Sequence, residues 1–281
     1  LFNDSGVSGW PVNLFRGIDS MFSGCTSFNV DLSDWATRID NGTGSRTLAG
    51  LFNDCTAFTN GGVGGVGSGL DSWQTGTVTT LASLFANTCG FNDRLDSWDT
   101  SNVTNMGSTF ANNSAFNNAG QNGVGLGIDN WDTSSVTTMA NMFEKYRGGT
   151  GFYLGSWNTS SVTSMYRMFG TNYYVFADFP TWNDGSINNW DVSNVTNMSQ
   201  MFRHNSVFNQ PLNNWNTGSV TDMSQMFSAG WNGNPVFDQN LGSWNVSSVT
   251  NFSNMFAHAL SGRSEEHTSE LQSPMYLVCR L

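Results

Sequence analysis

A nine-fold internal repeat constrains this chain more than any other feature of its sequence. The units are nearly alike: the clearest copies, which begin at Trp190 and Trp215, read Trp, then Val–Thr–x–Met–x–x–Met–Phe. The Trp190 copy continues with Phe–Asn and has a Leu before the next Trp. The framework Trp residues are Trp10, Trp35, Trp73, Trp98, Trp131, Trp157, Trp190, Trp215 and Trp244, and the matching Phe residues are Phe22, Phe52, Phe85, Phe110, Phe143, Phe169, Phe202, Phe227 and Phe256. A fixed period of this length predicts one supersecondary unit stacked on copies of itself, which is a solenoid.

Insertions lengthen some of the units at a point that can be located. The stretch from the Phe–Asn pair to the next Trp is normally seven residues. It is fifteen before Trp73 and Trp131, and fourteen before Trp190 when Phe176 is taken as the Phe of the pair. Insertions in solenoids form loops on one side of the stack. We therefore expect a row of three loops along one edge, two coils apart.

The Met–x–x–Met–Phe segment has the spacing of a short amphipathic helix. Met198, Met201 and Phe202 stand at i, i+3 and i+4, which places them on one helical face. Thr196 precedes them and suits the N-cap, because its hydroxyl can accept a hydrogen bond from a first-turn N–H. The segment is short, so we expect one or two helical turns, including the 3₁₀ alternative.

The segment before and after each Trp has the spacing of a strand. Leu212–x–x–Trp215–x–Thr217 matches the Leu–x–x–Leu–x–Leu spacing of a leucine-rich-repeat strand. Its apolar positions are expected to point into the coil. The positions expected to face water are Asn213, Asn214 and Asn216. The resulting fold class is an α/β repeat solenoid of about nine coils, each with a short parallel strand and a short helix.

The repeat resembles the BspA-like branch of leucine-rich repeats in bacterial surface proteins, whose unit is about 26 residues long. The resemblance extends from Phe2 to Phe256 and rests on the Val–Thr–x–Met–x–x–Met–Phe signature. It implies a right-handed coil and an extracellular or cell-surface module that mediates adhesion or binds a protein or glycan, without catalysis. The sequence departs from ordinary leucine-rich repeats where these place a ladder Asn, so no Asn ladder is assumed there. This slot holds Val103, Val136, Val162, Val195 and Val249.

The last nineteen residues do not follow the repeat. Residues 263–281 resemble the conceptual translation of a short-read sequencing adapter, and a genuine disordered tail is the alternative. Segments of this origin are excluded from fold reasoning. We therefore expect one solenoid over residues 1–262, cut within a unit at its start, with its caps, export signal and anchor outside this stretch.

Composition excludes several classes of partner. The net charge is −11, and Lys145 is the only Lys among ten basic residues. Nucleic-acid binding requires a basic patch, and binding to an anionic membrane requires a polybasic segment. The chain offers neither. It also contains no run of eighteen apolar residues, so we expect no membrane insertion.

Cysteine and histidine provide no catalytic or zinc motif. Cys25 and Cys55 follow their framework Phe by three residues, and Cys89 follows its own by four. The three are expected to be small side chains in a stacked slot, with a Cys25–Cys55 disulfide as the alternative in an oxidising compartment. His204 and His258 have no evident nucleophile or carboxylate partner. We therefore predict no enzyme, no catalytic residue and no required cofactor.

The most suggestive polar residues flank the framework Trp residues on the side expected to face solvent. They are Asp71, Asp96, Asp99, Asp129, Asp132 and Asp191, with Asn158, Asn189, Asn214, Asn216 and Asn245. Stacking would align them into columns of carboxylates and amides. Such columns suit Ca²⁺, which prefers oxygen ligands, and the candidate Ca²⁺ ligands are Asp96, Asp99, Asp129 and Asp132. The alternative is a solvated polar face with no ligand.

Two Trp residues fall outside the framework. Trp182 and Trp231 stand in inserted segments and are candidates for exposed contact residues, because aromatic side chains favour binding surfaces. Together with Asp191, Asn214 and Asn216 they form the predicted ligand-binding set. The leading function is adhesion or binding at a cell surface. The alternative is a structural spacer that holds a distal domain of a larger surface protein away from the cell.

Overall fold

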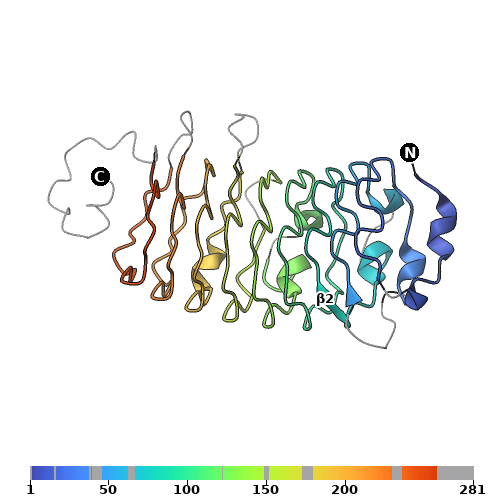
Figure 1. Ribbon diagram of the computed structural model, residues 1–281, viewed down its shortest axis with the longest axis horizontal. Coiled ribbons are helices and arrows are strands. Elements are labelled where there is room, and N and C mark those ends of the chain that lie inside the picture. The colour runs from blue at the N-terminus through green and yellow to red at the C-terminus, as the bar shows by residue number, and fades with distance from the viewer. Residues whose placement is uncertain are drawn as a thin grey trace.

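The computed structural model describes residues 2–15, 17–37, 39, 46–62, 67–121, 123–148, 152–172, 180–229 and 236–257. Successive repeats form irregular coils that stack in chain order along the long axis of the molecule (Figure 1). His258, Trp231, Phe176 and the suspected adapter segment 263–281 lie outside the described residues.

Short parallel pairings join consecutive coils at the Val–Thr–x segment. Strand β1 (Arg46–Thr47) pairs in parallel with β2 (Val78–Thr80). The same column then continues coil by coil through single parallel bridges, which join Thr80, Asn105, Thr138, Ser164, Asn197, Asp222 and Asn251. The predicted strand at Leu212–x–x–Trp215–x–Thr217 was therefore misplaced. That segment turns, with the Trp215 N–H donating to the Leu212 carbonyl at 3.2 Å.

The Met–x–x–Met–Phe segment forms two successive turns and not a helix. In one coil the turns close through N–H donation from Met201 to Met198 (3.2 Å) and from Asn205 to Phe202 (3.0 Å). The third residue of each turn, Gln200 and then His204, has a φ near +60°, which interrupts a helix. The intervening N–H groups instead donate to the next coil. The helix prediction was wrong because its apolar spacing fits this double turn equally well.

The expected N-cap was also wrong. The Thr196 hydroxyl donates to the Thr163 carbonyl of the preceding coil at 3.2 Å and caps no helix. None of the described residues is α-helical. The helices are all short and of the 3₁₀ type: η1 (Ser5–Gly9), η2 (Val12–Leu14), η3 (Ser33–Trp35), η4 (Asn60–Gly62), η5 (Gly69–Ser72), η6 (Asn118–Gly120), η7 (Gly127–Asn130) and η9 (Gly185–Asn189).

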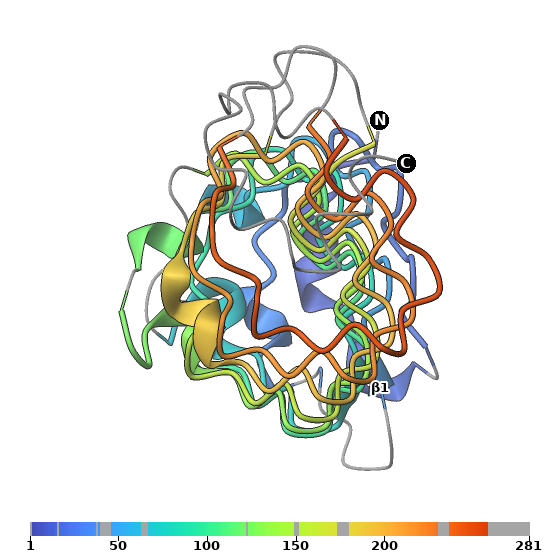
Figure 2. The same cartoon turned by 90° about the vertical axis from the view of Figure 1, so that its left-hand side faces the viewer.

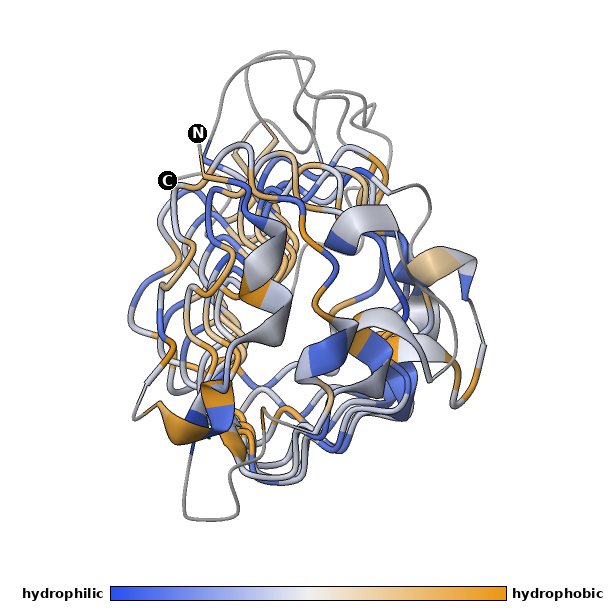
Figure 3. Cartoon of the chain, turned by 90° about the vertical axis from the view of Figure 1, so that its right-hand side faces the viewer, coloured by the Kyte–Doolittle hydropathy of each residue, from blue (hydrophilic) through white to orange (hydrophobic). Residues whose placement is uncertain are grey.

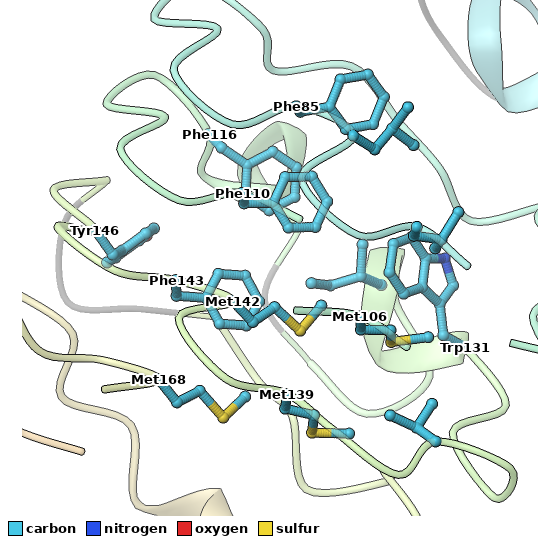
Figure 4. Close-up of a cluster of buried hydrophobic side chains, with 14 of the residues drawn as sticks. Phe85, Met106, Phe110, Phe116, Trp131, Met139, Met142, Phe143, Tyr146 and Met168 are labelled. Atoms are coloured by element: carbon cyan, nitrogen blue, oxygen red, sulfur yellow. The ribbon is translucent and has the colours of Figure 1, made fainter. Parts of the chain in front are cut away.

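Three columns of aromatic rings form the core: the framework Phe, the second Phe of each coil and the framework Trp. The framework Phe residues stack from Phe22 to Phe256 with ring centroids 5.6–6.0 Å apart. Within a coil, the Phe of the Phe–Asn pair stacks on the framework Phe, as Phe116 does on Phe110 at 3.9 Å. Met side chains fill the space between these rings and the Trp column, as Figure 4 shows around Phe143 and Met142. The core is thin but continuous along the stack.

The framework Trp side chains point inward and bond to the preceding coil. Eight of them are at most 6% exposed. Each of these indole N–H groups donates to the carbonyl of the Leu, Ile or Val that precedes the Trp of the previous coil, at 2.7–3.1 Å. The inward assignment is confirmed for these eight. Trp10 is the exception, because it belongs to the first coil and is 39% exposed.

The predicted row of three loops needs one correction. Helices η4 and η5 lie between Phe58 and Trp73, and η6 and η7 lie between Phe116 and Trp131, as expected. Figure 2 places η6 and η7 (green) and η9 (gold) on one side of the stack. The third insertion, however, ends before the Phe–Asn position, because Trp182–Asn183 occupies that position. Trp182 stacks on Phe169 at 4.0 Å, as Phe208 does on Phe202 at 3.9 Å.

An asparagine ladder is present at a position that the sequence analysis did not consider. In five coils the Asn that follows the second Phe or Trp182 (Asn3, Asn29, Asn92, Asn183 and Asn209) accepts at least one backbone N–H group from the following coil. Asn29 Oδ1 accepts from Thr59 and Gly61 at 2.8 Å, and Asn209 Oδ1 accepts from Asp238 at 2.8 Å. The position at which ordinary leucine-rich repeats carry their ladder Asn holds a buried Val in most coils, as Val103 and Val195 show at 0% exposure.

Candidate functional site

The side of the stack between Trp and Val carries an uninterrupted polar surface. In seven consecutive coils, from Trp73 to Val249, the Val follows the Trp by five residues without any insertion. We call the surface formed by the residues between them, extended to the following Thr, the Asx–Thr face. Its clearest segments are 99–104, 132–137, 158–163, 191–196, 216–221 and 245–250.

From Trp98 to Trp244, the first column of the Asx–Thr face consists of the exposed Asp or Asn after each Trp. In each coil its Oδ1 accepts the backbone N–H two residues later, which fixes the side chain. Asp99 accepts from Ser101 at 3.1 Å, and Asp191 accepts from Ser193 at 3.0 Å. The same bond is present at Asp132, Asn158, Asn216 and Asn245, at 2.9–3.2 Å. The column therefore presents polar groups in fixed positions.

Hydrogen bonds also adjust the acidity of this column. The Ser134 hydroxyl and then its N–H hold the pKa of Asp132 below its usual value. Ser193 has the same effect on the pKa of Asp191, again with the hydroxyl as the larger cause. Both bonds favour the ionised form. These two carboxylates are therefore charged at neutral and mildly acidic pH.

Two columns of Thr hydroxyls connect the coils along this face. The buried Thr two positions after the Trp donates to the backbone carbonyl of the Asp or Asn in the next coil, as Thr133 does to Asn158 at 3.0 Å. The exposed Thr after the Val donates to the carbonyl of the corresponding Thr in the preceding coil, as Thr137 does to Thr104 at 3.1 Å. In the four segments that carry both Thr residues (99–104, 132–137, 158–163 and 216–221), directional bonds on both sides thus maintain the register.

The four candidate Ca²⁺ ligands do not form one set. Asp129 is only 2% exposed, and its two oxygens accept the N–H groups of Ser156 (3.0 Å) and Gly125 (2.7 Å). Its predicted exposure was wrong, because the inserted loop before Trp131 folds over it. Asp71 is buried in the same way. Asp96 forms an ion pair with Arg94 at 2.5 Å and accepts the Gly127 N–H at 3.3 Å.

Asp99 and Asp132 alone among these four stand in the exposed column, one coil apart. Across the described part of the chain, no three His, Cys, Asp or Glu side chains are grouped as a metal site would require. Any Ca²⁺ held here would therefore take its remaining ligands from the bound partner or from water.

The predicted ligand-binding set is divided by the structure. Asp191, Asn214 and Asn216 are exposed as expected. Trp182 is not a surface residue, because its side chain is 0% exposed and lies between Phe169 and Phe208 in the core. Its placement in an inserted segment was misleading, since Trp182–Asn183 is itself the Phe–Asn pair of its coil. Trp231 lies outside the described residues.

A buried cluster of charged side chains lies on the double-turn side of the stack, and sequence reasoning missed it. Arg167 is 8% exposed and bonds through Nε and Nη2 to Gln200 Oε1, at 2.8 and 2.6 Å. Its Nη1 lies 3.6 Å from Glu144 Oε1, and its guanidinium lies 4.6 Å from the centre of the Tyr166 ring. Arg203 Nη1 donates to Asn172 Oδ1 at 2.5 Å.

Burial controls the acidity of this cluster. It raises the pKa of Glu144, although Arg167 and Lys145 oppose the shift. Burial also lowers the pKa of Lys145. One feature of the sequence could have predicted this cluster. Arg167 and Gln200 occupy the same place in the Met–x–x–Met segments of consecutive coils, so stacking brings them together. The mutual pairing of these groups indicates a structural network.

The cysteine and histidine side chains show no site chemistry. Cys55 is buried and its thiol donates to the Phe22 carbonyl at 2.9 Å, and burial raises the pKa of this thiol to about 12. Cys25 is half-buried, whereas Cys89 is exposed, so the stacked slot does not extend to Cys89. All three are free thiols. His204 is buried in the second turn and its N–H donates to the Ser228 carbonyl at 2.8 Å.

Comparison with known proteins identifies a family without assigning a function. Models of a Mycoplasma protein of unknown function, DUF285, match residues 1–66, 46–122, 121–186 and 173–271. These matches span most of the sequence, so the chain belongs to this family. No curated protein and no solved structure matches it. None of the helices in the described part of the chain has the length and hydropathy that a membrane crossing requires.

Proposed function

For this member of the DUF285 family, we propose a non-catalytic binding module that uses the Asx–Thr face to hold a protein or glycan ligand. The observation that carries the proposal is the regularity of this face. Insertions lengthen the other sides of the coils, whereas the described segments from Trp73 to Thr250 keep one spacing throughout. A long row of polar groups in fixed positions can contact an extended ligand at several coils together.

Preorganisation gives this face a physical advantage as a binding surface. The Asp and Asn side chains are restrained by their own turns, and the Thr side chains by bonds to the preceding coil. A partner would therefore immobilise few additional rotamers, and this loss of side-chain freedom is a major cost of association. The second oxygen or nitrogen of these Asp and Asn side chains would then bond to the partner or, for the oxygens, to Ca²⁺.

The proposal includes the fold class and the location. Stacked coils, parallel bridges and inward Trp and Leu support a leucine-rich-repeat-like solenoid related to the BspA-like proteins. The short segments between the bridges are turns and 3₁₀ helices. An extracellular or cell-surface location follows from the same resemblance. A face rich in Asp, Asn, Ser and Thr, with few cations, suits an environment that contains calcium and glycans.

The test is a binding screen against glycans and surface proteins, run with Ca²⁺ and with a chelator. The test variant carries Asp99→Asn, Asp132→Asn and Asp191→Asn on the Asx–Thr face. Its control carries Asp19→Asn, Asp31→Asn and Asp54→Asn, which remove the same charge from exposed positions elsewhere. We expect the test variant to lose at least tenfold in affinity while the control binds normally.

Equal binding by both variants contradicts the assignment of the ligand to this face. A chain that binds nothing across the screen, and whose melting temperature is the same with Ca²⁺ and with chelator, favours the spacer function instead. The spacer needs only the regular stack, and the exposed columns would then serve solubility.

A further inference from the structure

The Asx–Thr face offers equivalent positions in six consecutive coils. In each of them the exposed Thr after the Val donates its N–H group (2.8–2.9 Å) and its hydroxyl (3.1–3.3 Å) to the carbonyl of the Thr one coil earlier. Figure 3 looks along the stack, and the lower edge of the superposed coils has the blue to pale colours of hydrophilic residues. Such a surface suits a ligand that is itself a repeat, because each of its units can contact the same groups.

The spacing of the coils limits the kind of repeat. The Thr column is joined by backbone hydrogen bonds, which set neighbouring chains about 4.8 Å apart. At the other edge of the face, stacked Trp rings are 6.0–6.2 Å apart. One six-membered sugar ring in an extended, unbranched chain has a length within this range. A peptide strand repeats its side chains on one face every two residues, about 6.7 Å, and a polyproline helix every three residues, about 9 Å. The spacing therefore favours a polysaccharide with one sugar at each coil.

Most of the hydroxyl and amide protons of this face are used within the protein. A Ser two positions after the Asp or Asn donates its hydroxyl to that side chain, as Ser101 does to Asp99 and Ser160 does to Asn158 at 2.7 Å. In four coils the next residue donates to a carbonyl of the preceding coil, as Asn194 does to Ser160 at 2.7 Å. The hydroxyl oxygens therefore face the partner as hydrogen-bond acceptors.

The Asp and Asn column adds groups of both kinds. Its Oδ1 atoms are held by their own turns. The second oxygens of Asp99, Asp132 and Asp191 can accept hydrogen bonds, and the amide N–H groups of Asn158 and Asn216 can donate them. A sugar hydroxyl both donates and accepts. A chain of sugars can therefore pair with the acceptors and with the donors along this column.

Charge narrows the choice of polymer further. The six segments of the face contain Asp99, Asp132 and Asp191 but no Lys or Arg. An anionic polymer would meet like charges at three coils, and like charges suppress association. A polycation would find an opposite charge at only those three coils, because Asn occupies the column in the other three. A neutral polymer fits all six coils.

We propose that the ligand of the Asx–Thr face is a neutral, unbranched polysaccharide that lies along the stack in extended form, with one sugar at each coil. This inference rests on the proposed function, because it names the ligand class of the same face. The six subsites are similar and individually weak. Affinity then comes from the number of coils engaged together, and a short ligand can bind in several registers.

Isothermal titration calorimetry of the full chain, with a chelator present, tests the ligand class. The probes are β-1,4-linked oligosaccharides of glucose, mannose, xylose and N-acetylglucosamine, each with two, four and six sugars. Oligogalacturonates of the same lengths are the anionic counterparts. We expect at least one neutral series to bind, with an affinity that rises at least tenfold from two sugars to six, because added units contact added coils. The oligogalacturonates should bind at least tenfold more weakly than that series.

Two matched variants test the placement of one sugar at each coil. The central variant carries Asn158→Ala and Asp191→Ala, in the two middle coils of the face. The terminal variant carries Asp99→Ala and Asn245→Ala, in its two outer coils. Each loses one Asp and one Asn, and circular dichroism checks that both are folded.

The two variants differ in the run of intact coils that they leave. The terminal variant keeps one of the three registers that four sugars can take on six coils, so its affinity for the tetrasaccharide should fall about threefold. The central variant keeps no run of four intact coils, and its affinity for the tetrasaccharide should fall at least tenfold.

Three results overturn the proposal: no neutral series binds, two sugars bind as tightly as six, or the central and terminal variants lose equally. Failure of the proposed function gives a different result. A protein or polycation that binds through this face, without any neutral sugar, leaves the binding face in place and contradicts only the ligand class. Sugar binding that neither variant weakens places the ligand elsewhere and contradicts both.

Discussion

The Asx–Thr face and the opposite part of each coil, which carries the two stacked Phe residues, are built from the same repeat. They tolerate inserted residues very differently. On the Asx–Thr face, each coil bonds to its neighbours through directional N–H and hydroxyl groups, and the spacing is constant from Trp73 to Thr250. On the Phe side, Phe152 follows Phe143 by nine positions, whereas Phe116 follows Phe110 by six. The rings still meet, although Phe152 is turned edge-on to Phe143 at 5.2 Å.

The difference teaches which interactions control register. A hydrogen-bond column fails when one residue is inserted, because every following donor then faces the wrong partner. Aromatic rings contact through area, and the hydrophobic effect is non-directional. A longer chain segment can therefore still bring the second ring of a coil onto the framework Phe. That ring can also be of another type, as Trp182 is in place of Phe.

The largest expected effect concerns a framework Trp. Trp215→Ala should lower the free energy of unfolding by about 3–5 kcal/mol, as is typical when a buried aromatic side chain is truncated. Asn216→Ala, at the exposed neighbouring position, should be nearly neutral. Thermal or denaturant unfolding measures both. Equal losses for the two variants would contradict the inward placement of Trp215.

The next effect compares two Trp residues in different columns. Trp215→Phe leaves the Ile187 carbonyl without its indole donor, which is 2.8 Å away, and should cost about 1–3 kcal/mol. Trp182→Phe should be neutral or stabilising, because the buried Trp182 N–H has no partner in the described structure and other coils carry Phe at this position. Denaturant unfolding measures the loss of stability in both variants. A larger loss for Trp182→Phe than for Trp215→Phe would disprove the contrast.

A smaller effect separates the two Thr columns. Thr133→Val removes a buried hydroxyl that donates to the Asn158 carbonyl and should cost about 1 kcal/mol. Val192 occupies the equivalent position in its own coil, so the shape of Val is accepted. Thr137→Val removes an exposed hydroxyl and should change stability by less than about 0.5 kcal/mol. Unfolding curves that rank the two variants in the opposite order would refute this difference.

The smallest effect is a change of acidity on the Asx–Thr face. Ser134→Ala should raise the pKa of Asp132 towards its ordinary value, because the hydroxyl that favours the carboxylate is lost. Asp191, with Ser193 intact, serves as the internal control and should titrate as before. NMR titration of the side-chain carboxyls measures both, and a pKa of Asp132 that does not move removes Ser134 as its cause.

The sign of the linked stability follows from the same shift. The folded-state pKa of Asp132 lies below the unfolded value of about 3.9. Its contribution is therefore present above that value and declines as the pH falls through the folded-state pKa. Because Asp132 is exposed, we expect a contribution too small to alter the melting temperature measurably.

Much of the interior was predictable from periodicity. The positions of Leu212, Trp215 and Thr217 inside the coil follow from their recurrence, and all three are at most 2% exposed. The local conformation was less predictable. Met198, Met201 and Phe202 have a spacing that suits a helix, but the N–H groups between them find carbonyls in the next coil. That alternative partner is invisible in a single unit.

The candidate site was predicted in part for the same reason. Asp99, Asp132 and Asp191 are exposed where the repeat placed them. Asp129 follows the same pattern but is buried, because an inserted loop supplies two N–H groups to its oxygens. Trp182 was assigned to the surface because its position in the coil depends on which ring stacks on Phe169. The Arg167–Gln200 network likewise arises only when consecutive coils are superposed.

By itself, then, the sequence determined that the chain is a repeat protein, which residues recur inside each coil, and which polar residues recur outside. These properties depend on the chemistry of each position and on a constant period. Only the tertiary structure decided the turn conformation, the asparagine bonds between coils, and the burial of Asp129 and Trp182. Each of these depends on which atoms a neighbouring coil or inserted loop presents. A backbone donor adopts the conformation that gives it an acceptor. Here many of the acceptors belong to a neighbouring coil, about 25 or more residues away along the chain.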